Sequence, residues 1–170
     1  MKNIINIAIK VVLIILCVYS TNTVAQEMDY FKGTWRNQTG NKVFTVTLWQ
    51  DGPSVLKGHY KMITVNSSGQ QTGVVYDSNK PIGTSTTNWP FVLSVNIHSG
   101  SYTIGGPIKD NTVTNQRRFI DGMFSMESIS LICTTCVKKV RWKVKKDQGV
   151  RGIGEPDFNI PVNLELTKVE

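Results

Sequence analysis

Few residues of this chain combine the types and the spacing that catalysis requires. A hydrolytic triad needs a nucleophile, a base and an acid that orients the base. His98 beside Ser99 is the one suggestive neighbourhood, but adjacent strand residues point to opposite faces. The chain also lacks the Gly-x-Ser-x-Gly elbow of serine hydrolases. We therefore interpret His98-Ser99-Gly100 as a turn, and the sequence favours a protein that is not an enzyme.

Other arrangements for catalysis or cofactor binding fail on their spacing. Asp121 and Glu127 lie six residues apart in a strand-like run, which separates them by about 20 Å in extended geometry. Glycosidases need their two carboxylates within roughly 10 Å of each other. The glycines of residues 149–154 lack the lysine and the hydroxyl residue of a phosphate loop. We expect no cofactor.

Cys133 and Cys136 are the cysteines that remain if the first 25 residues are removed. An even number of cysteines in an exported protein predicts a disulfide, here a short structural clip. A redox pair, or a free or metal-linked pair, stays open as an alternative. Zinc would need four ligands, and the only histidines are His59 and His98, so no metal site is predicted.

Six basic residues lie within the run 138–146. Strand alternation puts Lys139, Arg141, Lys143 and Lys145 on one face, as a stripe about 20 Å long. Such a stripe fits contact with an anionic glycan, a lipid headgroup or an acidic protein. It also fits a solubilising face that blocks pairing between sheet edges. Nucleic acid is not an expected partner, because that function would normally add exposed stacking aromatics.

Residues 1–25 are typical of a secretory signal peptide. Lys2 supplies positive charge, residues 4–18 are mostly apolar, and Thr23-Val24-Ala25 offers a small-residue cleavage site. An uncleaved anchor is the alternative, but the unbroken apolar run, residues 11–18, is too short to span a bilayer. We therefore expect export and cleavage.

The remaining chain, residues 26–170, has the size of a single domain. It has no second stretch that approaches the roughly 18 apolar residues needed to span a membrane, so we expect a secreted or periplasmic protein. Its formal charge is +5, which is the +7 of the whole chain without Lys2 and Lys10. That charge is too modest to indicate nucleic-acid binding by itself.

Alternation with a period of two dominates the sequence after the signal peptide, and helical periodicity is almost absent. Residues with high strand propensity fill the alternating runs, and turn formers separate them. The expected strands are 33–37, 43–50, 56–65, 73–76, 89–98, 101–104, 117–132, 137–145 and 162–169. Their number and spacing predict an all-β domain, an antiparallel up-and-down β-barrel of about eight strands or, alternatively, a β-sandwich.

Three local features of this pattern bear on the interior. Residues 105–111 are expected to form a loop, and Gly122 is expected to mark a bulge. Phe44 and Trp49 point to opposite faces of one strand, and alternation alone does not show which of the two faces the interior.

The first hairpins resemble those of the avidin and streptavidin family. The resemblance is carried by Gly33-Thr34-Trp35-Arg36-Asn37-Gln38-Thr39-Gly40, Phe44-Thr45-Val46, Asp51-Gly52 and Leu56-Lys57-Gly58-His59-Tyr60. Lipocalins share the Gly-x-Trp, and Leu166-Thr167-Lys168-Val169 resembles the last strand of avidins. The resemblance implies that Trp35 plugs one end of a barrel and that Lys168 covers it in a cation–π contact.

The same resemblance implies candidate ligand contacts. Asn37 and Tyr60 match two avidin positions that hydrogen-bond the ligand, and Trp142 matches a later tryptophan of the wall. Asn41 and Met62 stand where the avidin site has hydroxyl residues. Because these contacts are missing, we do not expect tight biotin binding.

The whole chain after the signal peptide also resembles a domain-of-unknown-function family of short exported bacterial proteins. The shared features are Gly-Thr-Trp, Gly58-His59-Tyr60-Lys61-Met62, Trp142-Lys143-Val144, and Gly154-Glu155-Pro156-Asp157-Phe158 through Ile160-Pro161 to Leu166-Thr167-Lys168-Val169. This resemblance implies no activity.

The sequence thus predicts a non-enzymatic, exported barrel that holds a small, partly apolar ligand through Asn37, Tyr60 and Trp142. One alternative is a structural or surface-interaction module with a filled core. The other is a hydrolase or isomerase that uses the barrel cavity. A cavity of about 300–1,000 Å³ would favour the carrier. Titratable groups that converge inside the barrel would favour the enzyme.

Overall fold

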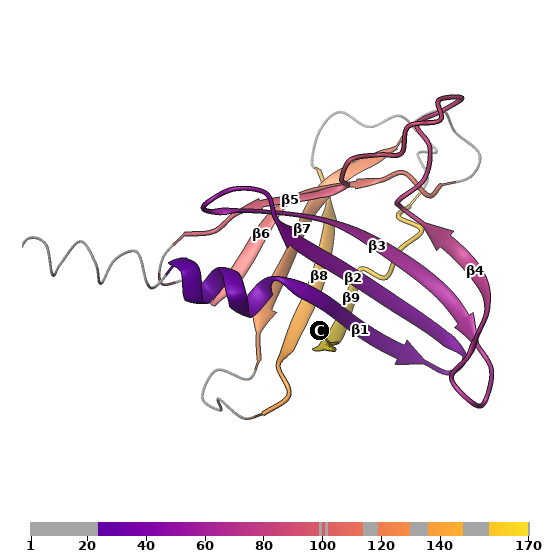
Figure 1. Ribbon diagram of the computed structural model, residues 1–170, viewed down its shortest axis with the longest axis horizontal. Coiled ribbons are helices and arrows are strands. Elements are labelled where there is room, and N and C mark those ends of the chain that lie inside the picture. The colour runs from indigo at the N-terminus through magenta and orange to yellow at the C-terminus, as the bar shows by residue number, and fades with distance from the viewer. Residues whose placement is uncertain are drawn as a thin grey trace, which may run out of the picture.

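The computed structural model describes residues 24–98, 100, 102–113, 119–129, 136–147 and 157–169. Within these residues a short helix, residues 24–31, is followed by nine strands (Figure 1). The strands are β1 (Gly33–Thr39), β2 (Lys42–Gln50), β3 (Val55–Val65), β4 (Gln71–Asp77), β5 (Leu93–Asn96), β6 (Thr103–Asp110), β7 (Ile120–Ser128), β8 (Lys139–Lys146) and β9 (Asn163–Lys168). The predicted signal peptide lies outside the described residues except for its last two positions, which begin the helix. No helix in the described part of the chain is long and apolar enough to cross a membrane.

Eight of the strands form a closed antiparallel barrel. The order of strands around the barrel is β1-β2-β3-β5-β6-β7-β8-β9, and β9 pairs with β1 to close it. The seam between β1 and β9 has Trp35 opposite Lys168 and Arg36 opposite Thr167. The predicted barrel is therefore confirmed, and the alternative β-sandwich is excluded. Closure also removes the exposed sheet edges that an open arrangement of these strands would present.

The ninth strand, β4, lies outside the ring because β3 divides one of its edges between two partners. Residues 55–58 of β3 pair with β5, and residues 61–65 pair with β4. The register shifts between Met62 and Ile63 and again between Thr64 and Val65. β4 therefore extends the sheet past the rim of the barrel (Figure 1).

The predicted loop over residues 105–111 is wrong, because most of it belongs to β6. Pro107 lies opposite Met123 of β7, and the register continues without interruption from Thr103 to Asp110. Gly106 is required because β5 passes very close to it. A side-chain carbon at position 106 would overlap the backbone carbonyl oxygen of Ser94. Glycine here permits the contact between strands, and does not mark a turn.

The predicted bulge at Gly122 is also absent. Gly122 lies opposite Ile108 on one side and Lys146 on the other, with no shift of register on either side. A side-chain carbon there would overlap the carbonyl oxygen of Lys145 and would come 2.6 Å from the Phe158 ring. The absence of a side chain at position 122 therefore allows Phe158, in the segment before β9, to pack against β7.

The interior of the barrel is filled by side chains. On β2, Phe44, Val46 and Leu48 are 0–1% exposed, whereas Trp49 lies on the outer face with its ring 5.5 Å from that of His59. The largest of the fully buried side chains are those of Trp35, Trp142, Tyr60, Phe31, Phe44, Phe124, Met28, Leu48, Leu56, Leu93, Ile108 and Met126. A void large enough for a water molecule would expose surface on the side chains that line it. The aromatic centre of this core is therefore closely packed.

We expect Gly106→Ala to lower the free energy of unfolding by about 1–3 kcal/mol or more, because the new carbon meets backbone that cannot rotate away. Gly52→Ala is the matched control, since its new carbon would lie 3.7 Å from Val55, an ordinary contact. Urea unfolding followed by tryptophan fluorescence measures both. Equal stabilities for the two variants would contradict the close approach of β5 and β6.

Candidate functional site

A short helix covers one end of the barrel, called here the helix end. Met28 and Phe31 of this helix are 2% and 1% exposed and belong to the core. Trp35, four residues after Phe31, is fully buried, and its Nε1 donates to the Phe31 carbonyl oxygen at 2.7 Å. Sequence analysis missed this helix because it has only two turns and begins inside the predicted signal peptide.

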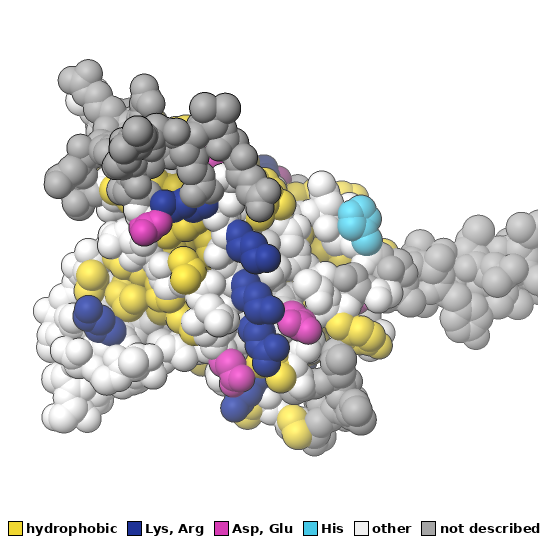
Figure 2. Space-filling view, turned by 180° about the vertical axis from the view of Figure 1, so that it is seen from behind, with side chains coloured by type: hydrophobic (Ala, Val, Ile, Leu, Met, Phe, Trp, Pro, Cys, Tyr) yellow, Lys and Arg dark blue, Asp and Glu magenta, His cyan; other side chains and the backbone are white. Residues whose placement is uncertain are grey.

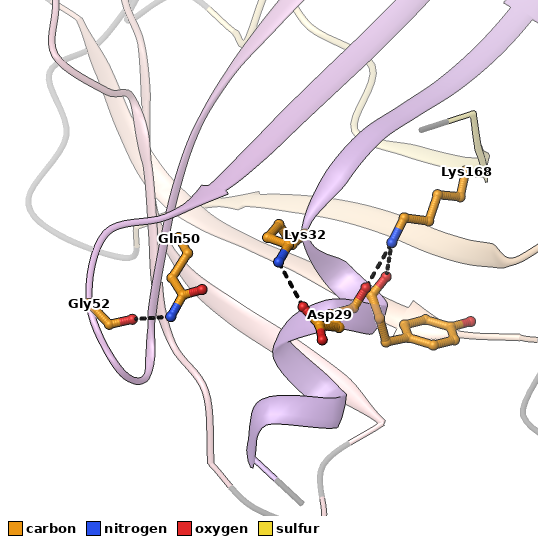
Figure 3. A network of polar contacts seen from close by, with 6 residues as sticks. Asp29, Lys32, Gln50, Gly52 and Lys168 are labelled. Atoms are coloured by element: carbon orange, nitrogen blue, oxygen red, sulfur yellow. Dashed lines mark hydrogen bonds and ion pairs between the residues drawn. The ribbon is translucent and has the colours of Figure 1, made fainter. Parts of the chain in front are cut away.

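Lys168 of β9 bonds the end of the helix to the seam between β1 and β9. Its Nζ donates to the carbonyl oxygens of Asp29 (2.9 Å) and Tyr30 (2.7 Å), as Figure 3 shows. The same ammonium lies 5.6 Å from the centre of the Trp35 ring. The last carbonyls of a helix lack partners within the helix, and a cation there is favourable. The structure thus places Lys168 over Trp35, and the helix terminus supplies its hydrogen-bond acceptors.

The position of Lys168 changes its acidity. Burial, followed by repulsion from Lys138, lowers the pKa of Lys168 to about 8. Asp29 opposes this shift by attraction. Asp29 itself is paired with Lys32 at 2.7 Å.

The three residues predicted to contact a ligand all lie near Phe44. Asn37 is opposite Phe44 in the β1–β2 register. The rings of Tyr60 and Trp142 lie 6.3 and 5.9 Å from the Phe44 ring. Phe124 also stacks on Trp142, with ring centres 5.4 Å apart. The structure therefore brings the three predicted residues together around an aromatic side chain of the protein itself.

Asn37 uses its side-chain amide to join two strands. Its Nδ2 donates to the carbonyl oxygen of Glu165 on β9 at 2.9 Å, and its Oδ1 accepts from Thr39 Oγ1 at 3.0 Å. Both ends of the amide are thus occupied by contacts within the barrel wall.

Tyr60 and Trp142 are likewise engaged by the protein. Tyr60 is 1% exposed and its hydroxyl donates to Asp110 Oδ1 at 2.9 Å. Trp142 is fully buried and its Nε1 donates to the carbonyl oxygen of Pro161 at 2.8 Å. The polar groups expected to hold a ligand hold other parts of the chain instead.

Asp110 organises the opposite end of the barrel, called here the Asp110 end. Its side chain is fully buried, and four donors reach its carboxylate. Oδ1 accepts from Tyr60 Oη (2.9 Å), the Thr112 backbone N–H (2.9 Å) and Thr112 Oγ1 (2.6 Å). Oδ2 accepts from the Asn159 backbone N–H at 2.7 Å. Every one of these donors is neutral, so among the described residues hydrogen bonds compensate the burial of the carboxylate.

Sequence analysis missed Asp110 because it assigned this residue to a loop. The sequence does offer one signal, because aspartate often accepts from the backbone N–H two residues ahead in an Asx turn. Asp110 makes this bond with the N–H of Thr112. The bond from Tyr60 joins residues 50 positions apart. Such a contact depends on the closed sheet and not on any local pattern.

Tyr60 and Asp110 are titratable groups that converge inside the barrel, the arrangement that would favour an enzyme. Burial, and then the charge of Asp110, raise the pKa of Tyr60 far above its usual range, so the phenol stays a proton donor. All of the carboxylate contacts described above are to the chain itself. Both residues are at most 1% exposed. In the described structure the pair therefore joins β3, β6 and the segment before β9.

Two polar atoms near this end are buried without a hydrogen-bond partner among the described residues: Tyr76 Oη and Asn111 Oδ1. Tyr76 packs edge-on against Tyr60, with ring centres 6.2 Å apart. Burial, followed by the charge of Asp110, raises the pKa of Tyr76. An unpartnered buried hydroxyl is costly, so these atoms mark where a small polar molecule would be favoured.

Several sequence predictions lie partly outside the described residues. Cys133 and Ser99 lie outside the described residues, so the Cys133–Cys136 disulfide remains a prediction.

His59 lies on the outer face, with Nδ1 3.0 Å from Ser78 Oγ, and burial lowers its pKa. Across the described ranges no three residues of the His, Cys, Asp and Glu types are grouped as metal ligands would be.

Comparisons of the chain with protein-family models, with curated proteins and with solved structures find no match. The assignment of function therefore rests on the geometry of the barrel.

We expect Tyr60→Phe and Tyr76→Phe to differ in their effects on stability, although each removes one buried hydroxyl. Tyr60→Phe removes a bond to a charged carboxylate and should lower the free energy of unfolding by about 1.5–3 kcal/mol. Tyr76→Phe removes an unpartnered hydroxyl and should be neutral or stabilising. Chemical denaturation measures both. A comparable loss for Tyr76→Phe would show that this hydroxyl has a partner.

We expect the stability contributed by Lys168 to rise between about pH 8 and pH 10. The unfolded lysine keeps its proton up to a pKa of about 10.4, whereas the folded one loses it near 8, so folding releases a proton in this window. The measurement is the free energy of unfolding against pH for the wild type and Lys168→Met. The free energy of unfolding of the wild type should increase relative to that of Lys168→Met as the pH rises. A difference between the two proteins that does not change with pH would contradict the lowered pKa of Lys168.

Proposed function

We propose that this protein is a non-enzymatic interaction module, an exported β-barrel that is filled by its own side chains and acts through its outer surface. One observation carries the proposal. Tyr60 and Trp142, the buried residues best suited to hold a ligand, donate instead to Asp110 and to the segment before β9. The core is thus completed by the chain.

A ligand in the interior would have to displace packed aromatic groups. Phe44, Trp142 and Phe124 form a continuous series of ring contacts across the barrel. Ligand sites of about 300–1,000 Å³ are far larger than the voids in such a core. Removing one large core side chain typically costs about 3–5 kcal/mol, so displacement would be opposed by the stability of the fold.

The second candidate is a carrier of a small ligand, as the resemblance to avidins and lipocalins implies. The observation that favours it is the pair of unpartnered polar atoms, Tyr76 Oη and Asn111 Oδ1. For such a ligand to reach Tyr60 and Trp142, the segment around Asn159 would have to leave Asp110. The ligand would then replace the hydrogen bonds that this segment now makes.

Native mass spectrometry of the protein purified from its own host distinguishes the two candidates. We expect the native and the denatured proteins to have the same mass, because the interior is occupied by side chains. A small molecule that is present on the native protein and released on unfolding would establish the carrier instead. Tyr76→Phe is the control, since loss of the molecule from this variant would place it at the Asp110 end.

The denatured mass also tests two further parts of the proposal. Cleavage after Ala25 removes the predicted signal peptide and fixes the new first residue at Gln26. A Cys133–Cys136 disulfide lowers the mass by two hydrogen atoms relative to the reduced chain. A full-length mass would contradict export by cleavage.

A further inference from the structure

The outer face of β8 carries a single column of basic side chains. Lys139, Arg141, Lys143 and Lys145 alternate with Val140, Trp142 and Val144, which are 0–6% exposed in the interior. Figure 2 shows Lys and Arg side chains in one file down the surface of the barrel, with acidic groups beside part of it.

The column is not explained by protection of a sheet edge. β8 pairs with β7 along one side and with β9 along the other, so it has no free edge to protect. Four like charges at alternate positions along one strand repel one another at spacings of about 7 Å. A concentration of charge on a fully paired strand therefore needs a different explanation.

The two halves of the column differ in how their charge is balanced. Arg141 lies opposite Glu127 on β7 and opposite Glu165 on β9, and its Nη1 is 3.9 Å from Glu127 Oε2. Lys143, in contrast, lies opposite Ser125 and Asn163. The positive charge is thus neutralised around Arg141 and remains in excess beyond it.

Lys145 continues this uncompensated half. It lies opposite Met123, whose side chain is 49% exposed. Among the acidic residues of the neighbouring segments, Asp121 pairs with Lys109 at 3.1 Å and Asp157 pairs with Lys146. Asp147 follows Lys145 by two residues and adds one negative charge just beyond the end of β8. Within the described residues, Lys143 and Lys145 form no ion pair. We call Lys143, Lys145 and Met123 the lysine surface.

We propose that the lysine surface is a docking site for an acidic, extended polypeptide segment of a partner protein. This inference rests on the proposed function, since it requires a module that acts through its outer face. Lys143 and Lys145 are about 7 Å apart along the strand, and carboxylates at alternate positions of an extended peptide repeat at the same distance. One peptide face can therefore place an acidic side chain over each lysine, with an apolar residue beside Met123.

The arrangement of charge favours this partner over an anionic membrane. A membrane is a plane, and it would bring Glu127 and Glu165 toward the headgroups on both sides of the column. The attraction of a few lysines, about 1 kcal/mol each, would be offset by these carboxylates. A narrow chain that lies along the lysine surface meets the cations and the exposed Met123 without crossing the acidic pair. Complementary charge along such a chain also sets its register.

The experiment is a titration of the purified protein with a fluorescent peptide in which Glu alternates with Thr. We expect Lys143→Gln together with Lys145→Gln to weaken binding about tenfold, and added salt to weaken it further. Lys42→Gln together with Lys80→Gln is the matched control. This pair removes the same charge from β2 and from the segment after β4, and should leave the affinity unchanged.

Other outcomes would overturn the docking site. Equal losses in the two double variants would show attraction by net charge alone. Equal affinity for a peptide with the same number of Glu residues at every third position, which puts successive carboxylates on opposite faces, would contradict the register between lysines and carboxylates. Binding to vesicles rich in phosphatidylserine, with no binding to the alternating peptide, would assign the surface to a membrane. If the native and the denatured proteins have the same mass but the protein binds neither peptide nor vesicles, the docking site alone is overturned. If native mass spectrometry finds a small molecule that is released on unfolding, the proposed function is overturned.

Discussion

The barrel depends on the seam between its first and last strands. β1 and β9 are opposite each other at two residue pairs, whereas β2 and β3 are opposite each other at nine. Side chains strengthen this short seam: Lys168 binds the end of the helix, and Asn37 donates to Glu165 beyond the paired positions. Trp35 lies under Lys168 and is bonded to the helix as well. Closure, helix docking and burial of the first tryptophan are therefore one interaction, and the other strands acquire a common interior because of it.

The two ends of the barrel are closed by opposite chemistry. At the helix end a cation satisfies carbonyl oxygens that the helix leaves free. At the Asp110 end a buried anion gathers N–H and O–H donors from β3, from the turn after β6 and from the segment before β9. Each end thus supplies the partners that its backbone lacks. In both cases the charged side chain is bonded to polar groups of the chain itself.

The sequence predicts those features that depend on local alternation. The faces of β8 follow directly from the alternation of basic residues with Val140, Trp142 and Val144. Only the first two residues of β6 were predicted, as part of the strand expected over 101–104. The rest was missed because Gly106 and Pro107 are usually strand breakers, and only the approach of Ser94 explains the glycine. The exclusion of β4 from the ring follows from the edge that β3 divides between two partners, which no alternation reveals.

The contacts of the candidate ligand residues could not be predicted from the sequence. Tyr60, Trp142 and Asn37 all lie near Phe44, and their hydrogen-bond partners are Asp110, Pro161 and Glu165. Each of these contacts joins parts of the chain that are distant in sequence. Residue types therefore indicate which groups face inward, whereas only the closed structure shows that the chain itself provides their acceptors.

Strand alternation finally limits where recognition can occur. Every barrel strand has one set of side chains that points inward and one that points outward. In this protein the inward set is committed to packing and to the two closed ends, so a change there is felt first as a loss of stability. The outward set carries no such constraint, and on β8 it bears charge that the fold does not need and only half neutralises. Lys143 and Lys145 are in no ion pair among the described residues, and the proposed docking site therefore lies at that half of the column.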